Sequence, residues 1–311
     1  MDQGLKFFRN YGIAFITVAL FLLLALTTEG FATERNMRNI LDQQSTVLIA
    51  ASFMTMAIIA GNFDVSVSSI FVVSPLFALY VENATGSVGL ALLAAITIGL
   101  LMGSFNGIIV TKFKINSFIG TLATSFMFFG IGYLISDRSL MRPDGEIYQQ
   151  LARTRYFGIT SASYIAIAVV VFAWILLSKT RFGRNVYATG GNREAARLAG
   201  VNVNFVQAMT FVLLGAASAL AGVINSSRSI SAQPSDDFSF VFAVLTAVIV
   251  GGTSISGGQG AIWRTVAAAF FLAFMSNGFN LHQVDPIWQR IIEGMVILIA
   301  VGIDAWTQRQ H

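Results

Sequence analysis

The sequence has no cysteine, only two histidines, and charged residues make up only 11% of its 311 positions. The lack of cysteine excludes disulfides and thiolate metal sites, and His282 and His311 are too few for a histidine metal cluster. An average soluble domain has about 25% charged residues, so this composition argues against a soluble enzyme and a nucleic-acid-binding domain. The chain also lacks a G-x-x-x-x-G-K-[ST] phosphate loop. The sequence therefore predicts neither a metal nor a bound cofactor.

Apolar residues, in contrast, are abundant. Hydrophobic residues make up 55% of the chain, with 28 glycines and 27 phenylalanines, and the mean hydropathy is +0.72. A soluble protein of this size could not bury so much apolar surface. In lipid, a backbone must satisfy its own hydrogen bonds, so long apolar runs form helices. We therefore predict an all-α, polytopic integral membrane protein.

Ten apolar runs are candidates for membrane-spanning helices. They cover residues 12–28, 46–61, 65–81, 88–110, 117–136, 163–178, 205–225, 240–252, 261–280 and 287–305. The largest gaps, 137–162 and 179–204, are too short to fold as catalytic domains. We therefore expect residues 1–311 to form a single transmembrane domain that is not an enzyme.

The charges between the runs predict the orientation in the membrane. With a cytoplasmic N-terminus, ten spans return the C-terminus to the cytoplasm, and all four lysines (Lys6, Lys112, Lys114 and Lys179) fall on the cytoplasmic side. The first run is interpreted as a retained helix rather than a signal peptide, because its apolar core is long and no small-x-small cleavage site follows. Spans two to five and seven to ten then have opposite orientations, which favours an inverted repeat.

The segment 179–204 carries the most informative local pattern. The Gly190-Gly191 pair is expected to break the chain, Asn192 is a good helix N-cap, residues 193–199 suit a short helix, and Gly200 can end it. Such a helix, with small residues on one side and charges on the other, suits a groove on a partner protein. The alternative is an ordinary basic loop that only sets topology, and composition alone does not separate the two.

Three strings in the chain resemble those of permease subunits in ATP-binding-cassette importers, in the branch that carries ribose, arabinose, xylose and galactose. Glu194-Ala195-Ala196, followed by Gly200, is similar to the EAA-x-x-x-G signature, although no I-x-LP ending follows. The string IIAGNFDVSVSSI resembles the branch's G-x-x-DLSVGS segment, with Val65 in place of the usual leucine. The string VGGTSISGGQG, starting at Val250, resembles its GG-x-S-x-x-GG-x-G loop. The similarity covers nearly the whole chain in a consistent order.

The resemblance implies a set of partners and a location. A permease of this branch lies in the bacterial inner membrane, pairs with a second permease subunit, binds two cytoplasmic ATPase subunits and receives a monosaccharide from a periplasmic sugar-binding protein. ATP is then hydrolysed in other chains. The resemblance also implies a coupling segment that contacts the ATPases, made of Gly191, Asn192, Arg193, Glu194, Ala195, Ala196, Arg197, Leu198, Ala199 and Gly200. Neither the sugar nor the identity of the second permease follows from the sequence.

Polar residues within the apolar runs are candidates for the substrate path. Breaks such as Gly61–Asp64 leave backbone groups and helix ends free to meet a substrate. The candidates are Asn62, Phe63, Asp64, Ser66, Ser68, Asn106, Asn116 and Asn277. For the asparagines, the alternative is pairing that holds helices together. For Asp64, the favoured alternative is a cap on the helix that follows.

Glycines support two further predictions. Gly99, Gly103 and Gly107 recur every four residues, a spacing that allows another helix to approach closely. The Gly251–Gly260 stretch is glycine-rich, but no lysine follows it and no strand is expected before it. We therefore predict a tight cytoplasmic turn that supports the coupling segment, and not a nucleotide site.

Two other functions remain as alternatives. An ion-coupled secondary sugar transporter would use Asp64 or Glu293, because a carboxylate within a membrane span is costly and is often functional. Such a carrier would transport sugar without any ATPase. A membrane-embedded enzyme is disfavoured, because the sequence offers no catalytic cluster.

Overall fold

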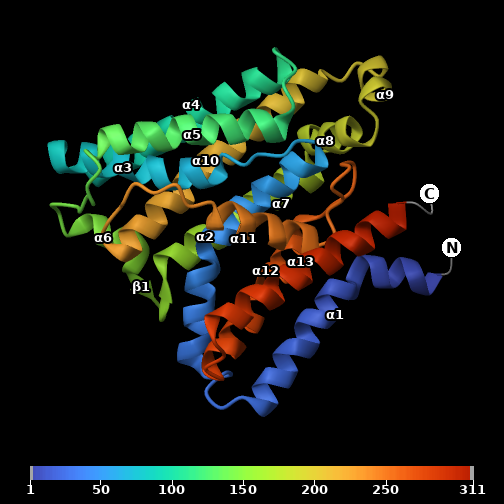
Figure 1. Cartoon of the computed structure of the whole chain (residues 1–311), viewed down its shortest axis with the longest axis horizontal. Coiled ribbons are helices and arrows are strands. Elements are labelled where there is room, and N and C mark those ends of the chain that lie inside the picture. Colours follow the sequence, from blue (N-terminus) through green and yellow to red (C-terminus); the bar gives the residue numbers. More distant parts are fainter. Residues whose placement is uncertain (1–2, 309–311) are drawn as a thin grey trace.

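The computed structural model describes residues 3–308, so Arg309 and His311 lie outside the described part, and it is almost entirely helical (Figure 1). Its elements in chain order are α1 (Gln3–Thr27), α2 (Glu34–Ile59), α3 (Val67–Thr85), α4 (Val88–Thr111), α5 (Ser117–Ile135), α6 (Ile147–Arg153), β1 (Arg155–Tyr156), β2 (Ile159–Thr160), α7 (Ser161–Lys179), α8 (Arg181–Gly191), α9 (Arg193–Leu198), α10 (Val203–Ser229), α11 (Ser239–Val250), α12 (Ile262–Leu281) and α13 (Pro286–Gln308). Each of the ten apolar runs coincides with a helix. The prediction of an all-α protein is therefore confirmed.

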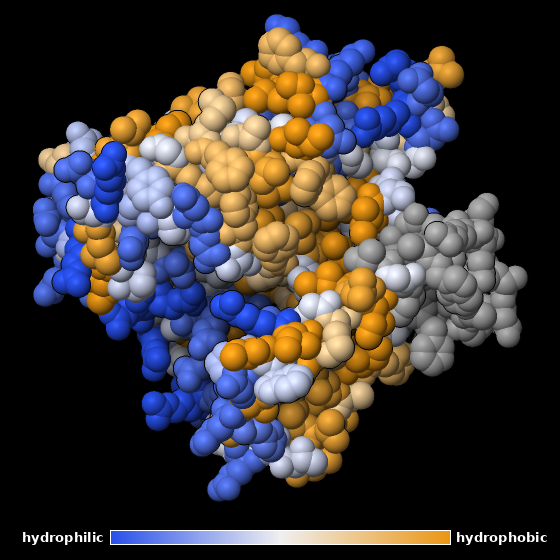
Figure 2. All heavy atoms as spheres, in the orientation of Figure 1, coloured by the Kyte–Doolittle hydropathy of each residue, from blue (hydrophilic) through white to orange (hydrophobic). Residues whose placement is uncertain are grey.

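The two ends of the molecule differ from its middle. We call the end that carries α8 and α9 the α9 end, and the opposite end, with α6, β1 and β2, the α6 end (Figure 1). Figure 2 shows hydrophobic residues across the middle, with hydrophilic residues gathered at both ends. The middle exposes large apolar side chains, among them Phe126 near the centre of α5, which is 59% exposed. A broad apolar surface between two polar ends suits a lipid bilayer.

Six helices of the described part are long and apolar enough to cross a membrane, namely α3, α4, α5, α7, α10 and α12. Shorter apolar stretches occupy Tyr11–Thr27 of α1 and Ser239–Val250, which is the whole of α11. The chain is therefore a multi-pass membrane protein.

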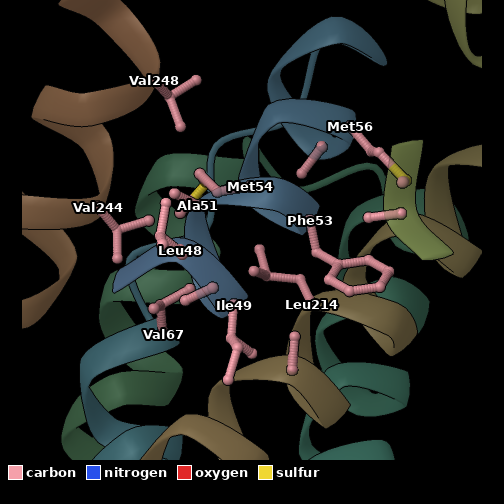
Figure 3. Close-up of a cluster of buried hydrophobic side chains, with 14 of the residues drawn as sticks. Leu48, Ile49, Ala51, Phe53, Met54, Met56, Val67, Leu214, Val244 and Val248 are labelled. Carbon is pink, nitrogen blue, oxygen red and sulfur yellow. The ribbon is translucent and has the colours of Figure 1, made fainter. Parts of the chain in front are cut away.

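Helix α2 lies at the centre of the fold. From Ser45 to Ile59, every side chain except that of Val47 is buried. Figure 3 shows apolar residues of α2 surrounded by Val67 of α3, Leu214 of α10 and side chains of α11. A helix that is apolar on all sides must be enclosed by other elements. Its first turns extend beyond the predicted run, which begins at residue 46, because Thr33 caps a polar start at the α6 end.

The glycines of α4 allow it to lie directly against α10. A Cβ atom at Gly99 or Gly103 would collide with the backbone carbonyls of Gly215 or Phe211 in α10. At Gly107, a Cβ would lie 3.1 Å from Cα of Ala208. The predicted close approach at these three glycines is confirmed, because only hydrogen atoms fit between the two backbones.

At the α6 end, the long connections are ordered and bonded to one another. The segment after α5 pairs with the segment after α10 through an isolated antiparallel bridge, in which Met141 and Ala232 exchange backbone hydrogen bonds of 2.8 and 2.9 Å. Tyr148 of α6 is fully buried and its hydroxyl is 2.7 Å from that of Ser226 in α10. Glu82 of α3 accepts hydrogen bonds from the backbone of the same connection.

Candidate functional site

The segment 179–204 forms two consecutive helices. In α8, Thr180 caps the first turn by accepting a hydrogen bond from the Gly183 amide at 3.2 Å. The Oδ1 atom of Asn192 accepts one from the Ala195 amide at 3.0 Å, so Asn192 caps α9 as predicted. Gly200 follows α9 with a φ of 82°, a left-handed conformation that glycine adopts readily.

The prediction that the Gly190-Gly191 pair breaks the chain is wrong by one residue, because α8 continues through Gly191 and the break falls at Asn192. The packing explains why glycine is needed there. Gly190 lies so close to the carbonyl of Ile59 that no Cβ would fit. Its role is therefore close contact between α8 and the end of α2.

Helix α9 presents most of its side chains to the solvent. Ala196 is buried against the protein, whereas Leu198 is 89% exposed. Glu194 and Arg197 form an ion pair of 3.1 Å, but both side chains are largely exposed, so the pair contributes little to stability. Leu198 therefore leaves an apolar side chain exposed next to Ala195 and charged neighbours.

The glycine-rich loop between α11 and α12 packs beside α8. The Gly258 amide donates to the Ile59 carbonyl at 2.9 Å, and the Tyr187 hydroxyl donates to the Gly260 carbonyl at 2.8 Å. A Cβ at Gly258 would approach Cα of Gly191 to 2.8 Å. The loop is therefore a tight turn at the α9 end, in direct contact with the segment that leads into α9.

The break between α2 and α3 is held by side chains of α5. The Ser117 hydroxyl accepts a hydrogen bond from the Phe63 amide at 3.0 Å, and that of Thr121 accepts one from the Val65 amide at 2.9 Å. These contacts satisfy backbone amides that a helix interruption would leave unpaired. Sequence reasoning placed Ser117 and Thr121 outside the candidate site, because nothing local indicates that they face the break.

Asp64 closes a turn just before α3. Its Oδ1 atom accepts hydrogen bonds from the Ser66 amide at 2.8 Å and the Ser66 hydroxyl at 2.5 Å, while its buried Oδ2 atom has no hydrogen-bond partner. The N-cap of α3 is Ser66, so the capping role favoured for Asp64 from the sequence is wrong by two residues. Asn106 continues the network, because its amide donates to the Ser66 hydroxyl at 2.7 Å and its carbonyl accepts from Thr124 at 2.7 Å.

The other path candidates also have structural partners. Asn62 is fully buried and bonds to Thr210 and Gln207 of α10. Asn116 caps α5 by accepting hydrogen bonds from two backbone amides. Asn277 of α12 exchanges hydrogen bonds of 2.8 and 3.0 Å with Asn36 of α2. Contact between these residues and a substrate therefore stays a prediction, because in this conformation they bond to the protein itself.

A second aspartate closes a turn with similar hydrogen bonds. Before α11, the Oδ1 atom of Asp237 accepts from the Ser239 amide at 2.8 Å and from the Ser239 hydroxyl at 2.5 Å. These hydrogen bonds hold the pKa of Asp237 below its usual value of 3.8. The signal was present in the sequence as two Asp-x-Ser strings, but only the structure shows that both turns lead into a helix, with Ser66 just before α3 and Ser239 at the start of α11.

The two helices that follow these turns, α3 and α11, meet in space. The Ser68 hydroxyl of α3 accepts a hydrogen bond from the Val241 amide of α11 at 2.8 Å. The rings of Phe71 and Phe240 stack beside it, with centroids 3.8 Å apart. The hydroxyl thus satisfies one of the free amides in the first turn of α11. Ser68 therefore joins the first turns of the two helices.

A family model described as "Branched-chain amino acid transport system / permease component" matches residues 36–301. The chain belongs to this family of transport permease components. It is 35% identical over 304 residues to the L-arabinose transport system permease protein AraH of Escherichia coli (strain K12), covering 98% of this chain and 93% of that one. It is 33% identical over 294 residues to the ribose import permease protein RbsC of the same strain, covering 92% of each.

The RbsC protein of Bacillus subtilis (strain 168) is 36% identical to the chain over 288 residues, covering 92% of this chain and 89% of that one. No solved structure matches the chain. The relatives are transport permeases and not enzymes, so the sequence-based conclusion that this chain is not an enzyme is confirmed. The resemblance to the arabinose and ribose branch of permeases is confirmed as well.

Proposed function

We propose that this chain is the membrane-spanning subunit of an ATP-driven importer and forms the path for a monosaccharide. The observation that carries the proposal is the similarity over nearly the full length of the chain to permeases named for L-arabinose and ribose. The family description mentions branched-chain amino acids, but the individual relatives are more specific than that heading. The chain makes and breaks no bonds, so other subunits supply the energy.

We infer ten membrane spans, formed by α1–α5, α7 and α10–α13, in the bacterial inner membrane. With ten spans, α1 begins and α13 ends on the same side, and Figure 1 draws both of these ends at the right, on the side of the molecule that carries α8 and α9. The turn that carries Lys112 and Lys114 lies at this α9 end, and so does Lys179 at the end of α7. Because cytoplasmic loops are rich in lysine and arginine, the α9 end faces the cytoplasm.

The two Asp-x-Ser turns support an inverted repeat of α2–α5 and α10–α13. The Asp64–Ser66 turn leads into the second helix of the first set, and the Asp237–Ser239 turn leads into the second helix of the second set, with equal hydrogen-bond lengths and an offset of one residue relative to the helix start. In the ten-span topology, α3 and α11 run in opposite directions. Equivalent helices of opposite direction are typical of transporters built from inverted repeats.

Residues 191–200, with α9 at their centre, act as the coupling segment in this proposal. The exposed Leu198 is the apolar anchor, and Ala195 and Ala199 are small enough to let α9 enter a groove on the ATPase. Two ATPase subunits bind at the α9 end, a periplasmic sugar-binding protein docks at the α6 end, and a second permease subunit completes the path. Binding and hydrolysis of ATP move α9, which alternately exposes the path to the two sides.

The path candidates keep their proposed role in a transport conformation different from this one. Asn62, Ser66 and Asn106 surround the break before α3, where hydroxyl and amide groups suit a neutral sugar. Phe63, half-buried at the same break, offers a ring against which a sugar can pack. Movement of α2 or α10 would release these side chains from one another.

Reconstitution in proteoliposomes tests the proposal. The chain, with its ATPase and binding protein, should take up labelled L-arabinose or ribose only when ATP and the binding protein are both present. The ion-coupled alternative, based on Asp64 or Glu293, predicts uptake by the chain alone under a proton or sodium gradient. Accumulation of sugar by the chain alone would refute the proposal.

A variant separates coupling from folding. Leu198→Asp should lower co-purification of the ATPase, because a charge replaces the apolar anchor, while insertion into the membrane is kept. The matched control is Leu140→Asp at the α6 end, where the leucine is also exposed. If both variants retain the ATPase equally, the anchor role of Leu198 is wrong.

A further inference from the structure

We propose that Arg193 is a positioning residue that ties the coupling segment to α2, so that α2 carries the displacement of α9 across the membrane. The inference rests on the proposed function, because it assumes that α9 receives the movement of an ATPase. In this inference, α2 is the element that α9 moves. The bond in question joins Nη2 of Arg193 to the carbonyl oxygen of Gly61, at 3.1 Å.

Three successive carbonyls at the end of α2 are each taken by a donor from a different element. The Ile59 carbonyl accepts from the Gly258 amide at 2.9 Å, in the loop before α12. The Ala60 carbonyl accepts from Gln207 of α10 at 3.2 Å. The Gly61 carbonyl accepts from Arg193 of α9. The last carbonyls of a helix have no partner within the helix, so these bonds hold the end of α2 in place.

Of the three donors, Arg193 alone belongs to the coupling segment. Gly258 and Gln207 join α2 to elements within the body of the permease, and Gln207 is buried. Arg193 is exposed on α9 and reaches back to the body. Besides the packing of Gly190 in α8 against Ile59, this side chain is therefore the direct link from α9 to α2.

The chemistry of the contact favours this pairing, although the bond is exposed to solvent. A guanidinium that donates to a carbonyl makes a charge-assisted hydrogen bond, which is stronger than a neutral one. A positive charge is also favourable at the C-terminal end of a helix. Gly61 has a φ of 80°, and a Cβ there would lie 3.1 Å from Nη2 of Arg193, so glycine leaves room for the guanidinium.

Helix α2 is built to transmit a displacement. Its 26 residues contain neither glycine nor proline, so no kink is expected, and at 1.5 Å per residue it is about 39 Å long. Helix α3, in contrast, contains Pro75. A shift at Gly61 is therefore expected to reach the first turns of α2 with little loss.

The far part of α2 is held by polar contacts that such a shift would strain. Asn36 exchanges hydrogen bonds with Asn277 of α12. Further along, Asp42 accepts from Thr160 at 2.7 Å through its carboxylate and from Arg228 at 2.9 Å through its backbone carbonyl. Axial movement of α2 would therefore loosen α12, α10 and the β2 strand at the α6 end. That end faces the binding protein in the proposed topology.

The first experiment compares Arg193→Ala with Arg193→Lys and with Arg184→Ala, which removes an exposed arginine from α8. Each complex is reconstituted with its ATPase and binding protein, and sugar uptake and ATP hydrolysis are measured together. Arg193→Ala should lower the sugar transported per ATP by at least about fivefold, the low end of usual coupling between sites. Uptake is expressed per ATP hydrolysed by the complexes that retain the ATPase, so a change in ATPase binding does not enter the ratio. The lysine variant should restore much of the ratio, and Arg184→Ala should leave it unchanged.

The second experiment detects the movement of α2 itself. Because the chain has no cysteine, Asn39→Cys places a single thiol at an exposed position in the first turns of α2. Its labelling rate in the assembled complex should differ with and without ATP. The same measurement with Arg193→Ala added should show no such difference.

Several outcomes would overturn the inference. The first is an unchanged ratio of sugar transported to ATP hydrolysed in Arg193→Ala. The second is loss of the ATPase from that variant, which would place Arg193 at the subunit contact. The third is a labelling rate of Asn39→Cys that does not respond to ATP, or a response that persists when Arg193→Ala is added. In each case the Asn39→Cys or wild-type complex still transports sugar with ATP, so the proposed function stands. Absence of ATP-dependent uptake by the wild-type complex would instead refute the proposed function.

Discussion

Replacing Gly103 of α4 with alanine should destabilise the fold. The added methyl group would collide with the carbonyl oxygen of Phe211 and approach Cα of Val212 to 3.0 Å. Overpacking of this kind typically costs about 1–3 kcal/mol, because backbones must move apart. Gly130 of α5 is the matched control, since it is also within an apolar helix but nothing lies within 4 Å of its missing Cβ.

The comparison of the two variants removes the effect of helix propensity. Alanine favours a helix over glycine by about 1 kcal/mol, and this gain applies equally to Gly103→Ala and Gly130→Ala. Their difference therefore reports the collision alone, about 1–3 kcal/mol, with Gly130→Ala the more stable. For chains of about 150–250 residues, 1 kcal/mol corresponds to about 2–4 °C in melting temperature, so a difference of several degrees is expected.

Thermal unfolding of the detergent-purified variants measures this difference. Gly107→Ala provides an intermediate case, because its Cβ would lie 3.1 Å from Ala208 and a small shift would relieve the contact. The melting temperature is expected to be highest for Gly130→Ala, lower for Gly107→Ala and lowest for Gly103→Ala. A Gly103→Ala protein that melts at or above Gly130→Ala would show that α4 and α10 are not in backbone contact.

Two further predictions concern Asn106 in the polar network and Asp237 in the turn before α11. Asn106→Ala should lower the free energy of unfolding by about 1–3 kcal/mol, because two buried hydroxyls each lose one of their two hydrogen bonds, whereas Ser104→Ala, which loses a bond within its own helix, should change it by less than about 0.5 kcal/mol. Equal melting temperatures of Asn106→Ala and Ser104→Ala would contradict this prediction. Asp237→Ala should lower the melting temperature at neutral pH but less so in acid: the pKa of Asp237 is lowered from 3.8 in the folded protein, so its stabilisation is present above pH 3.8 and is lost as the pH falls below it. If the difference in melting temperature between the wild type and Asp237→Ala did not depend on pH, stabilisation by the ionised Asp237 carboxylate would be refuted.

The helices themselves could be predicted, because apolar content and length determine them in lipid. Even the short run 240–252 coincides with α11. The start of α2 could not be predicted, since its first turns are polar and lie outside the apolar run. The short α6 and the β1–β2 hairpin were also missed, because they depend on burial of Tyr148 and on tertiary contacts that no periodic pattern reveals.

For the candidate site, capping residues were predictable and contacts across the fold were not. The roles of Asn192 and Gly200 at the two ends of α9 follow from local backbone chemistry, which a sequence displays directly. The bond from Arg193 to Gly61 joins residues 132 positions apart. A single sequence carries no information on which distant carbonyl an arginine will meet.

The bridge between Met141 and Ala232 has a consequence for how the α6 end can diverge. Both of its hydrogen bonds are made by backbone atoms, so neither side chain contributes to them. The bridge itself therefore excludes only proline, while burial of Ala232 in a hydrophobic cluster restricts that position to small side chains. Exposed residues of the two connections can change while the backbone framework at the α6 end stays the same.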